Sequence, residues 1–248
     1  YLLIEDGRIA EVGEGRLGAC DAEAIDAGGM LAIPCLVNAH THVGDSFAKD
    51  SGASLMLDEL VAPPNGLKHR LLASASAEEV IDGIRSSIEE MLSCGVSAFA
   101  DFREGGLRGV SLLREAASRY PIRAVALCRP VGDIEKSEEA LEDFAKAVEA
   151  SEGVGLSSAL EHSDGELRLA AELARDKLRA CHASEARPGE AYRALELLKP
   201  SFLVHLTKAD RRELAAVADE KVPVVCCPRS NLTMGMGPPP LKAMLDEG

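Results

Sequence analysis

Apolar runs recur along the chain at the spacing of one strand plus one helix. They predict seven strands, over residues 31–39, 96–100, 122–127, 154–157, 177–181, 201–204 and 222–227. The amphipathic stretches between them predict helices over residues 76–93, 137–150, 165–176, 189–198 and 209–220, and a last helix over 241–248. The first helix opens with a capping box, Ser-Ala-Glu-Glu at 76–79, and stops at Gly95. Strands that alternate with helices in this way are typical of a parallel α/β fold.

Two segments depart from this rhythm. Residues 1–30 predict short strands separated by Gly-rich turns. Residues 44–76 are long and mixed, with a turn signal at 62–66, and long insertions at the end of a strand often form lids or substrate contacts. We therefore expect a small β segment at 1–30 and an α/β domain at 31–248.

Composition narrows the class of ligand. Hydrophobic residues make up 46% of the chain, enough for a sizeable core, and the net charge of −14 argues against nucleic acid and anionic membranes as partners. No apolar run approaches the ~20 residues of a membrane span. Seven cysteines without a Cys-x-x-Cys pair indicate reduced thiols. We expect a cytoplasmic protein that acts on a small molecule.

Four of the six histidines lie at the ends of predicted strands. His40 and His42 end the first strand, and alternate residues of a strand point to the same face. His182 and His205 follow the fifth and sixth strands, and Glu185 lies three residues after His182. Neutral imidazoles gathered in this way are suited to a divalent metal ion.

Three stretches carry a resemblance to a known family: residues 37–42 (Val-Asn-Ala-His-Thr-His), 182–185 (His-Ala-Ser-Glu) and 227–231 (Cys-Pro-Arg-Ser-Asn). Their order and spacing resemble the amidohydrolase superfamily, in particular its cytosine deaminase and chlorohydrolase-like branch. The resemblance implies a (β/α)8 TIM-type barrel with its site at the carboxyl ends of the strands, preceded by a small β-sandwich that residues 1–30 would partly form.

The same resemblance implies an eighth strand that ends in an aspartate, a metal ligand and proton acceptor. The chain supplies about seven strand-helix units, and Asp246 lies in the last predicted helix. We therefore expect the chain to be part of a longer protein.

The resemblance also implies roles for the strand-end residues. His40, His42 and His182 would hold one divalent ion, with zinc expected and iron or manganese as alternatives. Glu185 would transfer protons between water and the leaving nitrogen, and His205 would orient or polarise the substrate. If two ions bind, His205 becomes a ligand. The fourth strand offers no lysine to bridge two ions, which favours one.

Further polar residues are candidates for substrate binding. Lys68 and His69 form a basic spot in the mixed stretch and would receive an anionic group, unless they belong to a solvated loop. Asp101 and Arg103 follow the second strand together with Glu104, where an ion-paired rim is the alternative. Asn231 follows the seventh strand.

These features favour a metal-dependent hydrolase of non-peptide carbon–nitrogen bonds. We expect an aminohydrolase (deaminase) of a cyclic amidine such as a nucleobase- or nucleoside-like heterocycle. Alternatives are a ring amidase, a chlorohydrolase, or a non-catalytic barrel that acts as an interaction protein. Aromatic residues make up only 3% of the chain, which leaves few stacking partners for a flat ring. A homo-oligomer is expected only by analogy with the family.

Overall fold

The computed structural model describes residues 1–18, 21–61 and 65–248, which form two compact units, Tyr1–Pro34 and Cys35–Gly248. In the first unit, β1 (Leu2–Glu5) pairs antiparallel with β2 (Arg8–Val12). Asp6 and Gly7 join them with φ angles of 51° and 73°, the left-handed conformation of a tight hairpin turn. The predicted short strands and the turn at Asp6-Gly7 are confirmed over residues 2–12, whereas the described residues from 13 to 30 form no strand.

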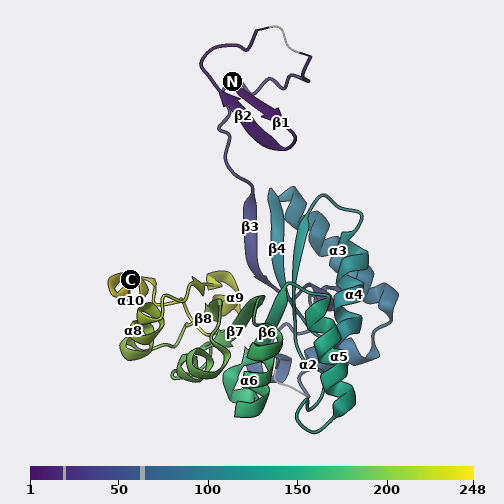
Figure 1. Cartoon of the computed structure of the whole chain (residues 1–248), viewed down its shortest axis with the longest axis vertical. Coiled ribbons are helices and arrows are strands. Elements are labelled where there is room, and N and C mark those ends of the chain that lie inside the picture. The colour runs from purple at the N-terminus through teal and green to yellow at the C-terminus, as the bar shows by residue number, and fades with distance from the viewer. Residues whose placement is uncertain (19–20, 62–64) are drawn as a thin grey trace. The chain divides into compact units, whose positions relative to one another are not determined.

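The second unit contains one sheet of seven parallel strands in chain order. Figure 1 shows helices packed along this sheet. The strands are β3 (Leu36–Thr41), β4 (Val96–Arg103), β5 (Arg123–Cys128), β6 (Gly153–Ser158), β7 (Leu178–Ala183), β8 (Phe202–His205) and β9 (Val224–Val225). The predicted succession of about seven parallel strand-helix units is confirmed.

Helices fill the connections between the strands. The α-helices are α1 (Leu57–Val61), α2 (Leu67–Ser74), α3 (Ala77–Ser93), α4 (Gly106–Ala117), α5 (Glu138–Glu149), α6 (Asp164–Leu173), α7 (Ala191–Arg193), α8 (Arg211–Asp219), α9 (Pro228–Thr233) and α10 (Leu241–Glu247). Two 3₁₀ helices, η1 (Val43–Ala48) and η2 (Ala159–Glu161), and a π-helical turn, η3 (Ala194–Leu198), complete the unit. Among the described residues, no helix has the length and apolar character needed to cross a bilayer.

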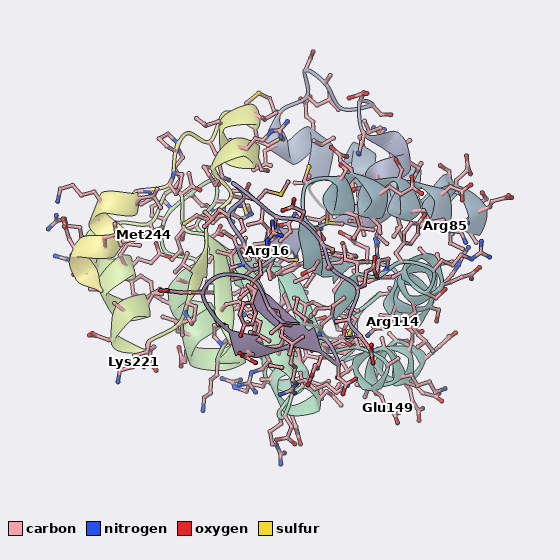
Figure 2. The ribbon with its side chains drawn as sticks, turned by 90° about the horizontal axis from the view of Figure 1, so that it is seen from above. Arg16, Arg85, Arg114, Glu149, Lys221 and Met244 are labelled. Atoms are coloured by element: carbon pink, nitrogen blue, oxygen red, sulfur yellow. The ribbon has the colours of Figure 1, made fainter. Side chains whose placement is uncertain are left out.

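The helices pack on the sheet through one apolar face. In α3, Val80, Ile81, Ile84 and Ile88 are buried, at the spacing of one helix face. The predicted capping box is present, since the Ser76 side chain accepts from the Glu79 amide and the Glu79 side chain accepts from the Ser76 amide. In Figure 2 the helices that carry Arg85, Arg114 and Glu149 lie next to one another.

The sheet is strongly curved. β3 and β8 are five places apart in the strand order, which is about 24 Å in a flat sheet. Yet the rings of His40 on β3 and His205 on β8 have centroids only 5.4 Å apart. Inside the curve, Phe102, Leu127, Ala180 and Val204 form a small buried cluster. The sheet is therefore most of a barrel wall.

Two predicted strands are shorter in the structure, while the second continues to Arg103 rather than ending at residue 100. The first begins at Leu36 rather than residue 31, and Met30, Leu31 and Ile33 are exposed instead of buried. Pro34 lacks an amide hydrogen and cannot donate to a ladder. The seventh is reduced to Val224–Val225, which pair with Leu203 and Val204. In both cases the apolar run is longer than the strand.

The long mixed stretch forms η1, α1 and α2. The predicted turn at 62–66 falls largely on residues 62–64, which lie outside the described residues.

Candidate metal centre

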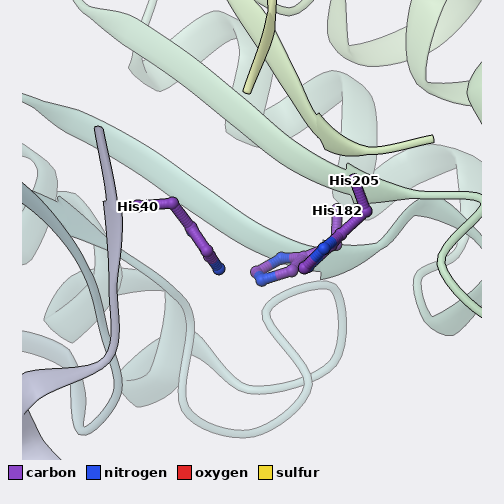
Figure 3. Close-up of side chains that lie close together, drawn as sticks. All are labelled: His40, His182 and His205. Atoms are coloured by element: carbon purple, nitrogen blue, oxygen red, sulfur yellow. The ribbon is translucent and has the colours of Figure 1, made fainter. Parts of the chain in front are cut away.

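Four histidines from three distant segments meet at the carboxyl ends of the strands. His40 belongs to β3, His42 follows β3 directly, His182 belongs to β7, and His205 ends β8. One nitrogen from each of His40, His182 and His205 lies within 4.8 Å of the others (Figure 3). Figure 3 shows the His40 ring pointing across the curve of the sheet toward the other two. The strand-end histidines thus converge as predicted.

His42 approaches the cluster through His182. The two Nε2 atoms are 3.2 Å apart. On the far side of the His182 ring, Nδ1 lies 2.8 Å from the Leu156 carbonyl oxygen, so Nδ1 carries the proton and Nε2 has a free lone pair. Ligand nitrogens of a tetrahedral zinc ion are about 3.3 Å apart, from a Zn–N bond of about 2.05 Å. The separation therefore suits a pair of imidazoles that share one ion.

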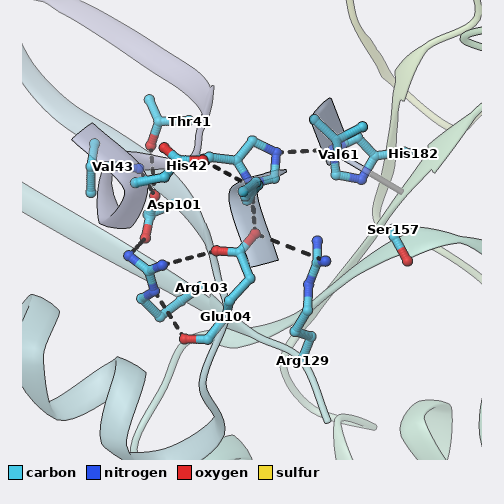
Figure 4. Close-up of polar contacts among 12 residues, drawn as sticks. Thr41, His42, Val43, Val61, Asp101, Arg103, Glu104, Arg129, Ser157 and His182 are labelled. Atoms are coloured by element: carbon cyan, nitrogen blue, oxygen red, sulfur yellow. Dashed lines mark hydrogen bonds and ion pairs between the residues drawn. The ribbon is translucent and has the colours of Figure 1, made fainter. Parts of the chain in front are cut away.

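A buried aspartate fixes the backbone around His42. Asp101 on β4 is fully buried, and its Oδ1 accepts hydrogen bonds from the Val43 amide at 2.6 Å and from the Thr41 hydroxyl at 3.2 Å. Thr41 and Val43 are the two neighbours of His42. Asp101 therefore holds the chain on both sides of this histidine (Figure 4).

Arg103, Glu104 and Lys68 continue this polar network. Arg103 is 2% exposed and lies between Asp101 Oδ2 at 3.3 Å and Glu104 Oε2 at 2.9 Å. Lys68 Nζ contacts Glu104 Oε1 at 2.6 Å and Asp45 Oδ2 at 3.3 Å. A Cβ on Gly44 would lie only 1.8 Å from the Arg103 guanidinium, so a larger residue here would displace Arg103 from its ion pairs.

The network reaches His42 at its Nδ1 atom. Glu104 Oε1 lies 3.2 Å and Lys68 Nζ 3.1 Å from this nitrogen. Burial alone would raise the pKa of Glu104, but the charges of Lys68 and Arg129 and the bond to His42 outweigh it and hold this pKa well below its usual range. Glu104 is therefore an ionised acceptor for the His42 ring.

All four imidazoles are held neutral. Burial is the largest cause, and it lowers the pKa of His40 and His182 well below the usual value and that of His205 to about 4. Burial and the Lys68 charge also lower the pKa of His42. A histidine binds a metal ion through a neutral ring. The cluster is thus ready to bind metal at neutral pH.

Glu185 lies on the loop after β7, beside His205. Its Oε2 atom is 3.5 Å from His205 Nε2, and its Oε1 accepts a hydrogen bond from Asn231 Nδ2 at 3.1 Å. Burial, followed by the charge of Glu190, raises the pKa of Glu185 to about 7, against the lowering effect of the Asn231 bond. At neutral pH this carboxyl group both takes and gives a proton.

Strained backbone positions accompany these side chains. Ser184, directly before Glu185, has a φ of 48°, and His205 has a φ of 78°. Positive φ is costly for residues other than glycine and is concentrated at functional sites. Ser184 is tied down by Glu213, which accepts from its hydroxyl, and by Glu190, which accepts from its amide at 3.0 Å.

The predicted substrate contacts have varied surroundings. Lys68 is buried in the ion network, so its interpretation as part of a solvated loop is wrong. His69 Nε2 lies 3.0 Å from the Val61 carbonyl oxygen and links α2 to α1. Asp101 and Arg103 are buried and form an ion pair, which agrees with the alternative prediction of an ion-paired rim. Asn231 is fully buried between Glu185 and His205.

Sequence reasoning grouped Glu104 with Asp101 and Arg103 as a possible substrate contact or ion-paired rim, and it gave Arg129 no role. Both stand at strand ends, Glu104 after β4 and Arg129 after β5, and that position was the available signal. Arg129 Nη1 lies 3.9 Å from Glu104 Oε1, and its Nε atom is buried without a hydrogen-bond partner among the described residues.

Comparisons with known proteins agree with this fold and site. The model of the amidohydrolase family matches residues 31–248. The chain belongs to the amidohydrolase family. A protein of Methanothermobacter thermautotrophicus named "Putative aminohydrolase" is 37% identical, over 100% of this chain and 68% of its own. A 5-methylthioadenosine/S-adenosylhomocysteine deaminase of Moorella thermoacetica is 28% identical, over 90% of this chain and 56% of its own.

Solved structures show the same architecture. A zinc-bound adenosine deaminase from Xanthomonas campestris has a TM-score of 0.69 and 21% identity, over 86% of this chain and 54% of its own. The predicted TIM-type barrel class is confirmed by such neighbours and by the parallel sheet. The chain spans about three fifths of the length of the curated relatives it matches.

Proposed function

We propose that this chain carries the metal centre of a hydrolase that acts on non-peptide carbon–nitrogen bonds. The reaction it fits best is aminohydrolysis, the release of ammonia from a cyclic amidine. The observation that carries the proposal is the convergence of four neutral histidines beside a carboxyl group whose pKa is about 7.

The donor atoms fit one divalent ion, and zinc is the ion proposed. His42 and His182 present their Nε2 atoms to each other at 3.2 Å, and His40 Nδ1 is buried without a hydrogen-bond partner in the described part of the chain. A buried polar atom without a partner is costly, and a metal ion would satisfy it. We assign His40, His42 and His182 as ligands. A bound ion would lower the pKa of water and supply a nucleophile at neutral pH.

Glu104 supports this ligand set. His42 Nδ1 lies 3.2 Å from the Glu104 carboxylate and 3.1 Å from Lys68 Nζ, and we propose that it donates its proton to the carboxylate. A carboxylate behind a ligand histidine fixes its tautomer and raises its basicity. The proton on Nδ1 leaves the His42 Nε2 lone pair free to face the lone pair of His182.

Glu185 is the proposed proton carrier. A general acid and base works best when its pKa is close to the working pH, and burial brings Glu185 to about 7. Its side chain is 19% exposed, so water and substrate can reach it from the strand-end face. We propose that Glu185 takes a proton from the attacking water and delivers it to the leaving nitrogen.

The substrate class rests on the relatives. Matches include proteins named as deaminases of 5-methylthioadenosine, S-adenosylhomocysteine and 5′-deoxyadenosine. We propose a nucleoside-like or nucleobase-like heterocycle on this basis. Hydrolysis of a ring amide or of a chlorinated ring is the second candidate, since an atrazine chlorohydrolase shares the fold with a TM-score of 0.62.

Three finer expectations stay proposals. The six cysteines in the described part of the chain are free, which supports a reducing, cytoplasmic location. The eighth strand with its aspartate and the homo-oligomer are not tested by the structure.

The proposal is tested by ammonia release from a panel of purine nucleosides, nucleobases, ring amides and chlorotriazines. In the protein with its complete coding sequence, Glu185→Gln should keep its zinc and lose turnover by about 10²–10⁴-fold, because the proton carrier is gone. Exposed Glu196→Gln is the matched control and should turn over normally. Near-normal turnover in Glu185→Gln would remove Glu185 from the mechanism.

A further inference from the structure

Asn231 is buried between Glu185 and His205, and this position indicates a role other than direct contact with the substrate. It lies in the short helix α9, is fully buried, and stands between the two residues assigned to proton transfer and substrate polarisation. Its Nδ2 atom lies 3.1 Å from Glu185 Oε1 and 3.1 Å from His205 Nδ1 (the amide oxygen is 3.4 Å from the same nitrogen).

The chemistry of the partners fixes the direction of these bonds. The ionised form of Glu185 only accepts hydrogen bonds, so the Asn231 amide group faces it with its nitrogen. That nitrogen carries two hydrogens. One goes to Glu185 and the other goes to His205 Nδ1, which must therefore accept. In a neutral imidazole the remaining proton is then on Nε2.

The other side of the His205 ring agrees independently. His205 Nε2 lies 3.5 Å from Glu185 Oε2. A proton on Nε2 would be attracted to this carboxylate oxygen. Asn231, Glu185 and His205 thus close a ring of three interactions, and both observations place the proton on Nε2.

We propose that Asn231 is a positioning residue that fixes His205 as the Nε2–H tautomer and holds Glu185 against it. This inference rests on the proposed function. A ring with its proton on Nε2 and directed at Glu185 has no free lone pair there, so His205 is not a metal ligand. His40, His42 and His182 are then the three histidines that bind the ion.

The backbone holds each member of the ring in place. The Asn231 amide donates to the Cys227 carbonyl at 2.9 Å, and the Asn231 carbonyl accepts from the Met236 amide at 2.8 Å. His205 has a positive φ of 78°, a strained conformation that surrounding contacts must maintain. Since both amide hydrogens of Asn231 are used within the ring, we do not assign it to substrate binding.

The test reads the ring nitrogens of His205 by NMR on protein labelled with ¹⁵N-histidine, with and without zinc. His205→Gln identifies the His205 signals. The wild-type protein should show the Nε2–H tautomer. Asn231→Asp, which is nearly isosteric but can only accept when ionised, should shift His205 to the Nδ1–H tautomer. Exposed Asn65→Asp is the matched control and should leave the spectrum unchanged.

Kinetics give the second readout. Asn231→Asp and Asn231→Leu should each lower kcat about 100-fold or more while zinc content stays at one per chain. Asn231→Asp keeps the test valid if the leucine variant does not fold. An Nδ1–H tautomer in the wild-type protein, or an unchanged tautomer in Asn231→Asp, would overturn the inference. If the tautomer responds as expected but no ammonia is released from any substrate, the inference stands and the proposed function fails.

Discussion

The chemistry of single residues in this site depends on the partner behind each imidazole. His182 is backed by the Leu156 carbonyl at 2.8 Å, His42 by Glu104 at 3.2 Å, and His205 by Asn231 at 3.1 Å. In our proposal the first two partners accept a hydrogen bond from Nδ1, which leaves the Nε2 lone pair free to bind an ion. The third donates a hydrogen bond to Nδ1, so the ring proton is on Nε2. Four histidines at strand ends therefore differ in function according to the hydrogen-bond partner of each ring.

Glu104→Gln tests the role of such a partner. The variant removes the charge that supports His42, so zinc affinity should fall about 10–100-fold, as for other carboxylates behind metal-bound histidines. Competition with a chromophoric chelator measures this affinity. Glu142→Gln, which alters an exposed pair with Lys146, is the matched control. Unchanged zinc affinity in Glu104→Gln would show that Glu104 does not support the ligand.

At the scale of elements, the junction of β3 and β4 holds the first histidine pair. Asp101 on β4 bonds to both neighbours of His42 and pairs with Arg103, and both side chains are almost fully buried. A buried ion pair that loses one partner leaves an uncompensated charge. The strands and the metal centre are therefore stabilised by the same carboxylate.

Asp101→Asn should lower the free energy of unfolding by about 3 kcal/mol, because Arg103 loses one of its two buried counter-charges. Urea denaturation of the metal-free protein measures this change. Asp82→Asn breaks an exposed pair with Arg85 and should cost well under about 1 kcal/mol. Equal and small effects of the two substitutions would contradict the structural role of Asp101.

The sequence predicts those elements whose signals are local. The capping box at Ser76 and the strand-end positions of His182 and His205 are legible from neighbouring residues. The start of the first strand is not, because the exposed residues before Leu36 are as apolar as a buried strand. The ion network could also not be predicted from the sequence, because Glu104 and Lys68 are 62 and 26 residues away from His42 along the chain.

At the scale of the whole molecule, curvature of the sheet turns separate strand ends into one site. The ring centroids of His40 and His182 lie 4.8 Å apart, although the residues are 142 positions apart in sequence and on strands four places apart in the sheet. The local pattern predicted the strands and their parallel order. The family resemblance was needed to predict that the sheet closes far enough to bring these ends together.

The central claim is that His40, His42 and His182 hold one ion and His205 holds none. Metal analysis of the zinc-loaded, dialysed protein tests it most directly, with His40→Ala and His205→Gln measured beside the wild type. We predict one zinc per chain in the wild type, close to none in His40→Ala, and one in His205→Gln. Two zinc ions in the wild type, full zinc in His40→Ala, or its loss in a folded His205→Gln variant would contradict this account.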